Sequence, residues 1–137
     1  MAEATLGKTL HVTVITPAKS VFDAQATSVV VPAFDGELGV MPGHAPLLAL
    51  LGTGEMRLTT PNGETKKLAL RGGFLQVNNN NVTVLTPEAA SGEELKPDAL
   101  LAELEKINAQ KAVKLEERDA QEVKRQWVRA RQKAVAK

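Results

Sequence analysis

The chain has 137 residues, which is enough for one ordinary domain or for a small domain with an appendage. A formal net charge of +1 argues against a dedicated nucleic-acid-binding protein, which would carry a marked basic excess. Because the chain has no cysteine, disulfide bridges, a thiolate nucleophile and a cysteine-ligated metal are excluded.

The first part of the chain is typical of short β-strands joined by turns. Apolar and polar residues alternate over 10–14, which is the period of a half-buried strand. A turn at 17–20 leads into a β-branched stretch over 21–31, and Asn62-Gly63 is a hairpin signal because both residues tolerate positive φ. Further strands are expected at 56–59, 67–70, 74–77 and 82–85. Short strands at this spacing predict an antiparallel β-sandwich, or flattened barrel.

Glycine and proline concentrate in residues 31–48, where three of each occur among eighteen residues. Glycine allows positive φ, and proline fixes φ and removes a hydrogen-bond donor, so this stretch is neither a helix nor a long central strand. We expect Glu37 and His44 to be presented outward by its corners. The predicted features are a tight loop at 35–36, a very short strand over 38–41 and a second corner at 42–43.

The composition changes near Pro97. All ten glycines and all seven prolines lie at or before this residue. The formal charge changes from −2 over residues 1–97, with 7 basic and 9 acidic side chains, to +3 over residues 98–137, with 10 and 7. We therefore divide the chain into a β-sandwich domain at 1–90 and a helical domain at 91–137.

The last part of the chain has the apolar periodicity of two helices. Pro97 suits a first helical position, and Asp98 complements the positive end of the helix dipole. We expect two apolar stripes to be buried against each other in an antiparallel hairpin. The first stripe is Leu100, Leu101, Leu104 and Ile107, and the second is Ala120, Val123, Trp127, Ala130 and Ala134.

The break between the two helices is predicted at 116–119. This segment contains neither glycine nor proline, but Asp119 followed by Glu122 resembles a capping box that would start a second helix. Such a cap contributes only about 1 kcal/mol, so one continuous helix about 60 Å long, at 1.5 Å per residue, stays open as an alternative. The chain is therefore expected to switch between a folded-back hairpin and an opened form that buries its stripes on a partner.

The second helix carries an excess of positive charge. Residues 124–137 contain six basic side chains and no acidic one. A solvated helix face is one interpretation, and docking on an acidic surface, with ion pairs that salt would weaken, is the sharper one. Nucleic acid is disfavoured because the basic residues are interleaved with only one aromatic residue and match no recognised motif, and membrane insertion because the apolar stripe is rich in alanine. The cations that would make such a contact are Lys124, Arg125, Arg129, Arg131 and Lys133.

Catalysis and metal binding are only weakly indicated. Asp35, Glu37 and His44 are the candidates for a small hydrolase, but the chain has only two histidines and neither a paired nucleophile nor a third ligand nearby. We therefore expect no catalytic residue and no metal site, and interpret Glu37 and His44 as loop contacts to a partner. Gly72-Gly73 is interpreted as a bend between strands rather than a phosphate loop, because no helix follows it.

Residues 36–47 read GELGVMPGHAPL, and this string resembles the signature of the epsilon subunit of the F-type (rotary) ATP synthase. Supporting similarities are HVTVITP at 11–17, LRGGFLQV at 70–77 and NVTVL at 81–85. The resemblance covers essentially the whole chain. It implies an N-terminal β-sandwich followed by a C-terminal two-helix hairpin.

The resemblance also implies a role. In that family the non-catalytic subunit couples rotation of the membrane ring to ATP synthesis in a proton-translocating enzyme, and its helices open to inhibit ATP hydrolysis. The sandwich binds the central-stalk gamma subunit and rests on the c-subunit ring, while the helices contact the alpha/beta catalytic head. Carried over to this sequence, the ring contact is Phe34, Asp35, Gly36 and Glu37, the gamma contact is Met41, Pro42 and His44, and the head contact is the basic set on the second helix.

Some members of that family bind ATP in the helical domain through a motif of the form Ile/Leu-Asp-x-x-Arg-Ala. Asp98 and Ala102 match this motif, but Pro97 and Leu101 replace its aliphatic residue and its arginine. Because the cation that would meet phosphate is missing, we expect weak ATP binding or none, and no other cofactor. A free-standing nucleotide-sensing protein is the alternative function, which a ligand titration would distinguish.

The sequence shows no basic region followed by an apolar stretch at its start, and its longest apolar run, 45–51, is only seven residues long. We expect a peripheral protein that contacts a membrane only through partner subunits. By resemblance, its place would be the cytoplasmic face of an energy-transducing membrane, either a bacterial plasma membrane or the stromal or cytoplasmic side of a thylakoid.

Overall fold

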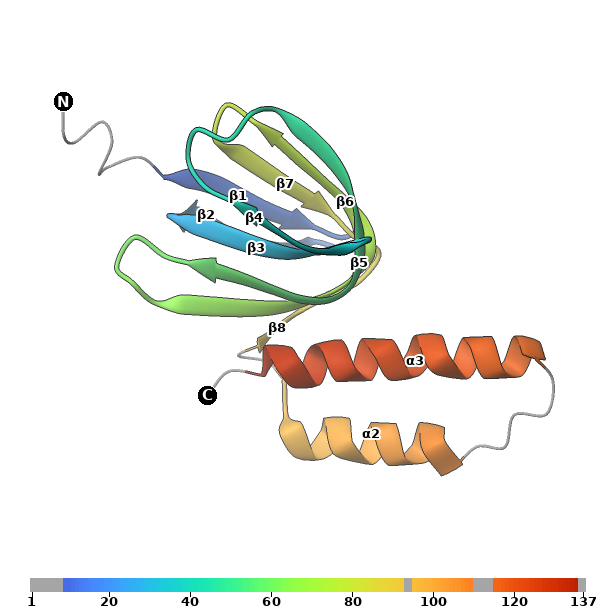
Figure 1. Ribbon diagram of the computed structural model, residues 1–137. Helices are drawn as coiled ribbons and strands as arrows, with labels where there is room; N and C mark the ends of the chain where they lie inside the picture. The colour runs from blue at the N-terminus through green and yellow to red at the C-terminus, as the bar shows by residue number, and fades with distance from the viewer. Residues whose placement is uncertain (1–8, 93–94, 110–114, 136–137) are drawn as a thin grey trace.

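The computed structural model describes residues 9–92, 95–109 and 115–135. Figure 1 shows the strands gathered together, with two antiparallel helices beneath them. Within the described residues the strands are β1 (Leu10–Ile15), β2 (Ser20–Ala26), β3 (Ser28–Ala33), β4 (Gly36–Val40), β5 (Leu47–Thr59), β6 (Thr65–Asn78), β7 (Asn81–Leu85) and β8 (Ala89–Ser91). The helices are α2 (Pro97–Ala109) and α3 (Leu115–Ala134). The predicted fold class, a β-sandwich followed by a two-helix hairpin, is confirmed.

The strands follow one hydrogen-bonded path in the order β2-β1-β7-β6-β5-β3-β4, and β8 pairs with β6. All neighbours are antiparallel except β1 and β7, which are parallel. The two longest strands, β5 and β6, each contribute to both layers of the sandwich: β6 pairs with β8 over its first half and with β7 over its second. Sheet pairing therefore extends to Ser91, one residue beyond the expected limit of the first domain.

The bend predicted at Gly72-Gly73 is present, but it lies within the continuous strand β6 instead of separating two strands. Both glycines have positive φ, 72° and 110°, a region that other residues rarely occupy. A Cβ atom at Gly73 would lie 2.0 Å from the carbonyl oxygen of Leu85. The crossing of β6 from one layer to the other therefore requires glycine.

The strand expected at 56–59 begins nine residues earlier, because β5 starts at Leu47. Its first residues are apolar on both faces: Leu51 points into the core, whereas Leu48 is 71% exposed. A strand that is apolar on both faces lacks the alternation that identifies a half-buried strand. Because residues 45–51 form one continuous apolar run, alternation of apolar and polar residues could not identify this half of β5 as a strand.

Strands alone close the core of the sandwich. Its buried side chains alternate along the strands of both layers, as expected for two facing sheets. Among the described residues, no helical one belongs to this cluster. Its fully buried members include Leu10, Val12, Val14, Val29, Val31, Met56, Leu58, Leu70, Leu75, Val77, Val82 and Val84. The sandwich thus has a core of its own, independent of the hairpin.

The helix break predicted at 116–119 is wrong. α3 begins at Leu115, so Asp119 lies inside the helix and does not cap it. Glutamate and arginine are good helix formers, and a capping box that contributes about 1 kcal/mol does not outweigh their propensity. The connection between the two helices lies at 110–114, outside the described residues.

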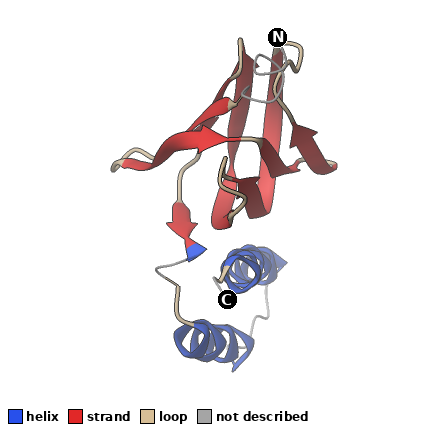
Figure 2. Ribbon diagram, turned by 90° about the vertical axis from the view of Figure 1, so that its left-hand side faces the viewer, coloured by secondary structure: helices blue, strands red, loops and turns tan. Residues whose placement is uncertain are grey.

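The expectation that the two apolar stripes bury each other is also wrong, because α3 has two buried stripes. Trp127, Ala130 and Ala134 pack on Ala69 of the sheet. A second stripe, which includes Val128, packs on Leu100 and Ile107 of α2. The helix α3 thus lies between the sheet and α2, as Figure 2 shows. Three members of the predicted stripes, Leu101, Ala120 and Val123, are exposed instead.

Candidate functional site

The residues expected to contact a membrane ring lie in the turn between β3 and β4 and at the start of β4. Phe34 is 77% exposed, and its backbone N–H donates to the carbonyl oxygen of Leu50 over 2.9 Å. Asp35 is exposed, and Gly36 has a φ of 144°. The predicted tight loop is confirmed, and it presents an aromatic ring and a carboxylate at one end of the sandwich.

Glu37 on β4 starts an ion-pair network that reaches β5 across the intervening strand β3. Its carboxylate accepts a hydrogen bond from Arg57 over 3.0 Å, and Arg57 also donates to Glu55 over 2.9 Å. The hydrogen bond to Glu55, followed by that to Glu37, raises the pKa of Arg57 above its ordinary value. β4 is an edge strand that pairs only with β3, so this network ties it to β5 as well. Glu37 therefore helps to hold its own loop in place.

The residues expected to contact a gamma subunit lie in the connection between β4 and β5. The corner is closed by the His44 N–H, which donates to the Met41 carbonyl oxygen over 3.1 Å. It is fixed to the turn between β6 and β7 because the Gly43 N–H donates to Asn80 Oδ1 over 2.7 Å. Met41 is left exposed and His44 partly exposed. The second predicted corner is thus present, held by backbone groups and one asparagine.

The structure does not bring the two contact sets together. They lie at opposite ends of β4, whose five residues span about 17 Å at 3.4 Å per residue. The first set, at the start of β4, borders α3: Phe34 shares a groove of about 370 Å³ with Arg129 and Lys133. The second set, at the end of β4, neighbours the turn between β6 and β7.

An exposed apolar row crosses the outer face of the sandwich, and the sequence analysis missed it. Cross-strand pairing places Leu50 beside Phe74, Phe74 beside Leu85, and Leu85 beside Ile15. All four side chains are at least one third exposed, and Leu48 extends the row along β5. Contiguous apolar surface of this kind marks interaction sites on soluble proteins. The signal was available in the run 45–51, which has apolar residues on both faces of a strand.

The basic set on α3 divides into two groups. Lys124, Arg129 and Lys133 are exposed. The other two cations bind α2: Arg125 donates to Asn108 Oδ1 over 2.6 Å, and Arg131 makes an ion pair with Glu103 over 2.7 Å. Three of the five predicted cations are thus available to a partner in this arrangement, while two hold the hairpin closed.

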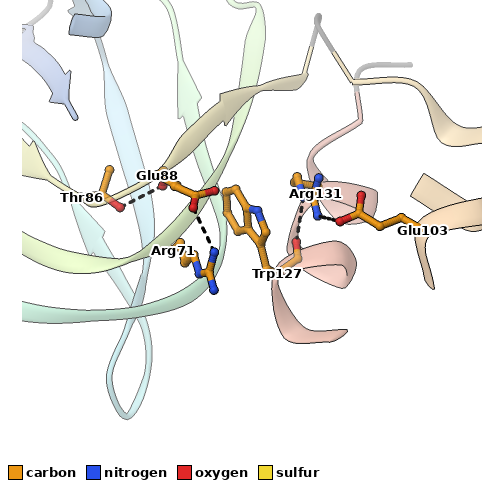
Figure 3. Close-up of polar contacts among 6 residues, drawn as sticks. All are labelled: Arg71, Thr86, Glu88, Glu103, Trp127 and Arg131. Atoms are coloured by element: carbon orange, nitrogen blue, oxygen red, sulfur yellow. Dashed lines mark hydrogen bonds and ion pairs between the residues drawn. The ribbon is translucent and has the colours of Figure 1, made fainter. Parts of the chain in front are cut away.

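Trp127 lies at the junction of the sheet and the two helices (Figure 3). The guanidinium carbon of Arg131 is 5.0 Å from the centre of its ring, in a cation–π contact. Beside the indole, Arg71 of β6 pairs with Glu88 over 3.0 Å. The same residues line a hollow of about 440 Å³ between the sandwich and the hairpin. Both arginines in this hollow are paired with carboxylates.

Asp98, the partial match to a nucleotide motif, is exposed in the first turn of α2. Within residues 9–92, 95–109 and 115–135, no group of three or more His, Asp or Glu residues is arranged to hold a metal ion. In the same part of the chain, neither helix has the length and apolar character needed to cross a membrane.

Comparison with known proteins places the chain in a family. The sequence profile described as "ATP synthase, Delta/Epsilon chain, beta-sandwich domain" matches residues 9–92, the span from just before β1 to just after β8. The chain belongs to the ATP synthase epsilon-chain family. An epsilon chain is a subunit of an enzyme complex, and the resemblance noted in residues 36–47 is thereby confirmed.

Relatives match along most of the chain. The ATP synthase epsilon chain of Synechococcus sp. (strain JA-2-3B'a(2-13)) is 45% identical over 102 residues, which cover 72% of this chain and 74% of the relative. That of Cyanothece sp. (strain PCC 7425 / ATCC 29141) is 41% identical over 130 residues, which cover 94% and 92%. The similarity to these epsilon chains therefore extends from the sandwich into the hairpin.

Two solved structures have a similar fold at low sequence identity. A chain in the Euglena gracilis mitochondrial ATP synthase (OSCP/F1/c-ring, rotational state 1) gives a TM-score of 0.79 at 22% identity, covering 89% of this chain and 78% of that chain. A chain in the central stalk/c-ring of the Tetrahymena thermophila mitochondrial ATP synthase gives 0.64 at 20% identity, covering 94% and 98%. Both likenesses show a shared fold alone.

Proposed function

We propose that this epsilon chain is a non-catalytic subunit of the central stalk, which couples rotation of the membrane ring to ATP synthesis and inhibits ATP hydrolysis through its C-terminal helices. The observation that carries the proposal is the division of the molecule into separate cores. The sandwich core consists of strand residues alone, while the hairpin is held by two smaller clusters. The hairpin can therefore leave the sheet without unfolding the part that binds the stalk.

The gamma subunit is the proposed partner of the outer apolar row and of the corner formed by Met41, Pro42 and His44. The row supplies exposed leucine and phenylalanine side chains on a rigid sheet, which is the composition expected at the centre of an interface. The corner adds a methionine that fills irregular gaps and a partly exposed histidine. The corner and the row meet along β5, which starts directly after the corner.

The c-subunit ring is the proposed partner of the β3–β4 turn, formed by Phe34, Asp35, Gly36 and Glu37. The turn lies at the far end of β4 from the gamma contact, so the two partners do not compete for one surface. An aromatic side chain beside carboxylates would fit a partner whose loops present polar groups around an apolar pocket. The subunit would thus reach the membrane through the ring, as a peripheral protein on the cytoplasmic face of an energy-transducing membrane.

The alpha/beta catalytic head is the proposed partner of the basic set on α3. In the docked hairpin, Lys124, Arg129 and Lys133 are already exposed. Separation of α3 from α2, after the hairpin has left the sheet, would break the contacts of Arg125 and Arg131 with α2 and make two more cations on the same helix available. An acidic segment on the head would then attract the opened helix more strongly than the docked one.

Co-purification with the gamma subunit tests the docking surface. Leu50→Gln removes an apolar side chain at the β5 end of the row, and we expect roughly fivefold weaker binding, which corresponds to a loss of about 1 kcal/mol of binding free energy. Leu101→Gln is the matched control, since Leu101 on α2 is 52% exposed and Leu50 is 48% exposed. Equal binding by the two variants would contradict the assignment of the row to gamma.

A free-standing nucleotide sensor is the alternative function. The hollow between the sandwich and the hairpin is the best place for a nucleotide, and it is lined by four cations. Two of these, Arg71 and Arg131, are already neutralised by Glu88 and Glu103, whose carboxylates would also repel phosphate. We therefore expect weak binding of ATP or none. Calorimetry on the isolated chain that gave a sub-millimolar dissociation constant for Mg-ATP would favour the alternative.

A further inference from the structure

Gly92 occupies a tight contact between the sandwich and the hairpin. It follows β8 directly and is buried. A Cβ atom at this position would lie 2.0 Å from the carbonyl oxygen of Ala134 and 3.0 Å from that of Lys67. Contacts to Cβ below about 3 Å lie well inside the optimal separation of non-bonded atoms. The docked arrangement of the hairpin therefore has room for glycine alone at this position.

The local backbone does not itself require glycine at position 92. Its φ is outside the positive range found at Gly72 and Gly73. An alanine would thus fit the chain at this point if the neighbouring backbone moved away. Most of the obstacle comes from Ala134, which belongs to the other end of the hairpin.

The far end of the hairpin returns to the segment that joins the hairpin to the sandwich. Ala134 is the last residue of α3 and is fully buried, and the C-terminal end of the helix lies beside β8 (Figure 1). Leu95, which follows the junction, packs against both hairpin clusters. The end of α3 therefore lies against Gly92, at the point where the sandwich ends.

We propose that the contact between Gly92 and the Ala134 carbonyl is a lock that holds the hairpin in its docked position. While the last turn of α3 rests on Gly92, this residue is held between the helix end and the Lys67 carbonyl of β6, so the hairpin has to lift its C-terminal end before it undocks from the sheet. The inference rests on the proposed function, since it concerns the movement through which the helices would inhibit hydrolysis. It adds the position at which that movement begins and the residue that permits the docked state.

The effect of a larger residue follows from the geometry. A methyl group at position 92 has to displace the Ala134 carbonyl oxygen by more than 1 Å, measured from the 2.0 Å separation. The buried residues at the interface between α3 and the sheet are Ala69, Ala130 and Ala134 and one large side chain, Trp127. An overpacking penalty at such a small interface lowers the ratio of docked to undocked hairpin by roughly tenfold or more.

The fluorescence of Trp127 measures docking of the hairpin directly, because Trp127 is the only tryptophan in the sequence. Its side chain packs against the sheet and is only 8% exposed. In the full chain carrying Gly92→Ala, we expect its fluorescence emission to shift to the red and its quenching by acrylamide to increase. Gly39→Ala is the matched control, because no atom lies within 4 Å of a Cβ built there and its φ is not positive. If the Trp127 indole is equally protected from acrylamide in both variants, the proposed lock is wrong.

A shortened chain that ends at Lys133 identifies which neighbour is responsible. It lacks the Ala134 carbonyl, so Gly92→Ala is expected to have no further effect on Trp127 in that background. If the substitution exposes Trp127 as much in the shortened chain as in the full one, the obstacle is the Lys67 carbonyl and the proposal fails. If the shortened chain has already released Trp127, the end of α3 is what holds the hairpin, as the lock requires.

The lock and the regulatory role can fail separately. Fluorescence of the isolated chain tests the lock without any partner. Hydrolysis by an assembled complex carrying Gly92→Ala tests whether opening matters: a released Trp127 with unchanged hydrolysis would uphold the lock and contradict the proposed inhibition.

Discussion

Replacing Trp127 by alanine should release the hairpin and leave the sandwich folded. Trp127 is the one large side chain among the buried members of its cluster; the others are alanines, and the partly buried Leu95 packs against them. Tryptophan-to-alanine changes in cores destabilise by about 3–5 kcal/mol, and we expect a value near 3 kcal/mol because the indole also borders an open hollow. This corresponds to a shift of roughly 100-fold in the docking equilibrium.

Hydrogen exchange of the backbone amides measures this effect separately for each element. Two short helices without a sheet to pack on are marginally stable in water, so the amides of α2 and α3 should lose about 100-fold in protection. The amides of β1, β6 and β7 should keep theirs, because the sandwich core contains no helical residue. Leu101→Ala is the control, since an exposed side chain contributes within about 0.5 kcal/mol. Equal loss of protection in strands and helices would refute the separation of the two cores.

Three further predictions concern polar contacts. Arg131→Ala should lower the melting temperature of the helices, and the effect should shrink in about 1 M salt, because the ion pair to α2 is screened; an equal effect at low and high salt would contradict this reading. Asn80→Gly keeps a position of positive φ but removes the acceptor for the Gly43 N–H, so exchange of that amide should rise by roughly fivefold for a bond of about 1 kcal/mol, whereas Asn79→Gly should leave it unchanged. For Arg57, whose pKa is raised in the folded state, the stabilising charge is fully present below the ordinary pKa and is lost only as the pH rises through the raised value. The stability difference between the parent and Arg57→Gln should therefore stay constant from about pH 6 to pH 9, and a slope in that window would show that another group controls the network.

The fold could be predicted from the sequence wherever one principle governs an element. The β-strand at 10–14 alternates in the sequence and is alternately buried in the structure. The corners around Gly36 and Gly43 follow from residues that permit positive φ, and both glycines have it. Pro97 begins α2, as expected for a residue that lacks an N–H.

The prediction failed where an element packs against two neighbours. Periodicity selected a single stripe on α3, but the helix lies between the sheet and α2 and needs two. Val123 fits the first stripe by spacing and is exposed, whereas Gln121 is buried and donates its amide to the Ile107 carbonyl over 2.5 Å. A sequence does not state how many partners a helix will have, so the number of stripes follows only from the tertiary arrangement.

The parts of the candidate site that depend on local backbone chemistry could be predicted from the sequence, whereas the parts that depend on tertiary packing could not. The turn at Phe34 and the corner at His44 are defined by local backbone chemistry, and the structure has both. The apolar row from Leu50 to Ile15 depends on the pairing of four strands, which no short stretch of sequence specifies. The engagement of Arg131 with α2 likewise depends on how the helices pack.

We propose that the β-sandwich domain binds the central stalk and that the hairpin, which can leave the sheet, controls ATP hydrolysis. The most direct measurement compares ATP hydrolysis by the assembled catalytic head and gamma subunit with the full chain and with a chain that ends at Pro97. The shortened chain keeps every residue of the sandwich core, so it should still co-purify with gamma and should no longer suppress hydrolysis. A shortened chain that binds and still suppresses hydrolysis, or one that is folded and no longer binds, would contradict the account.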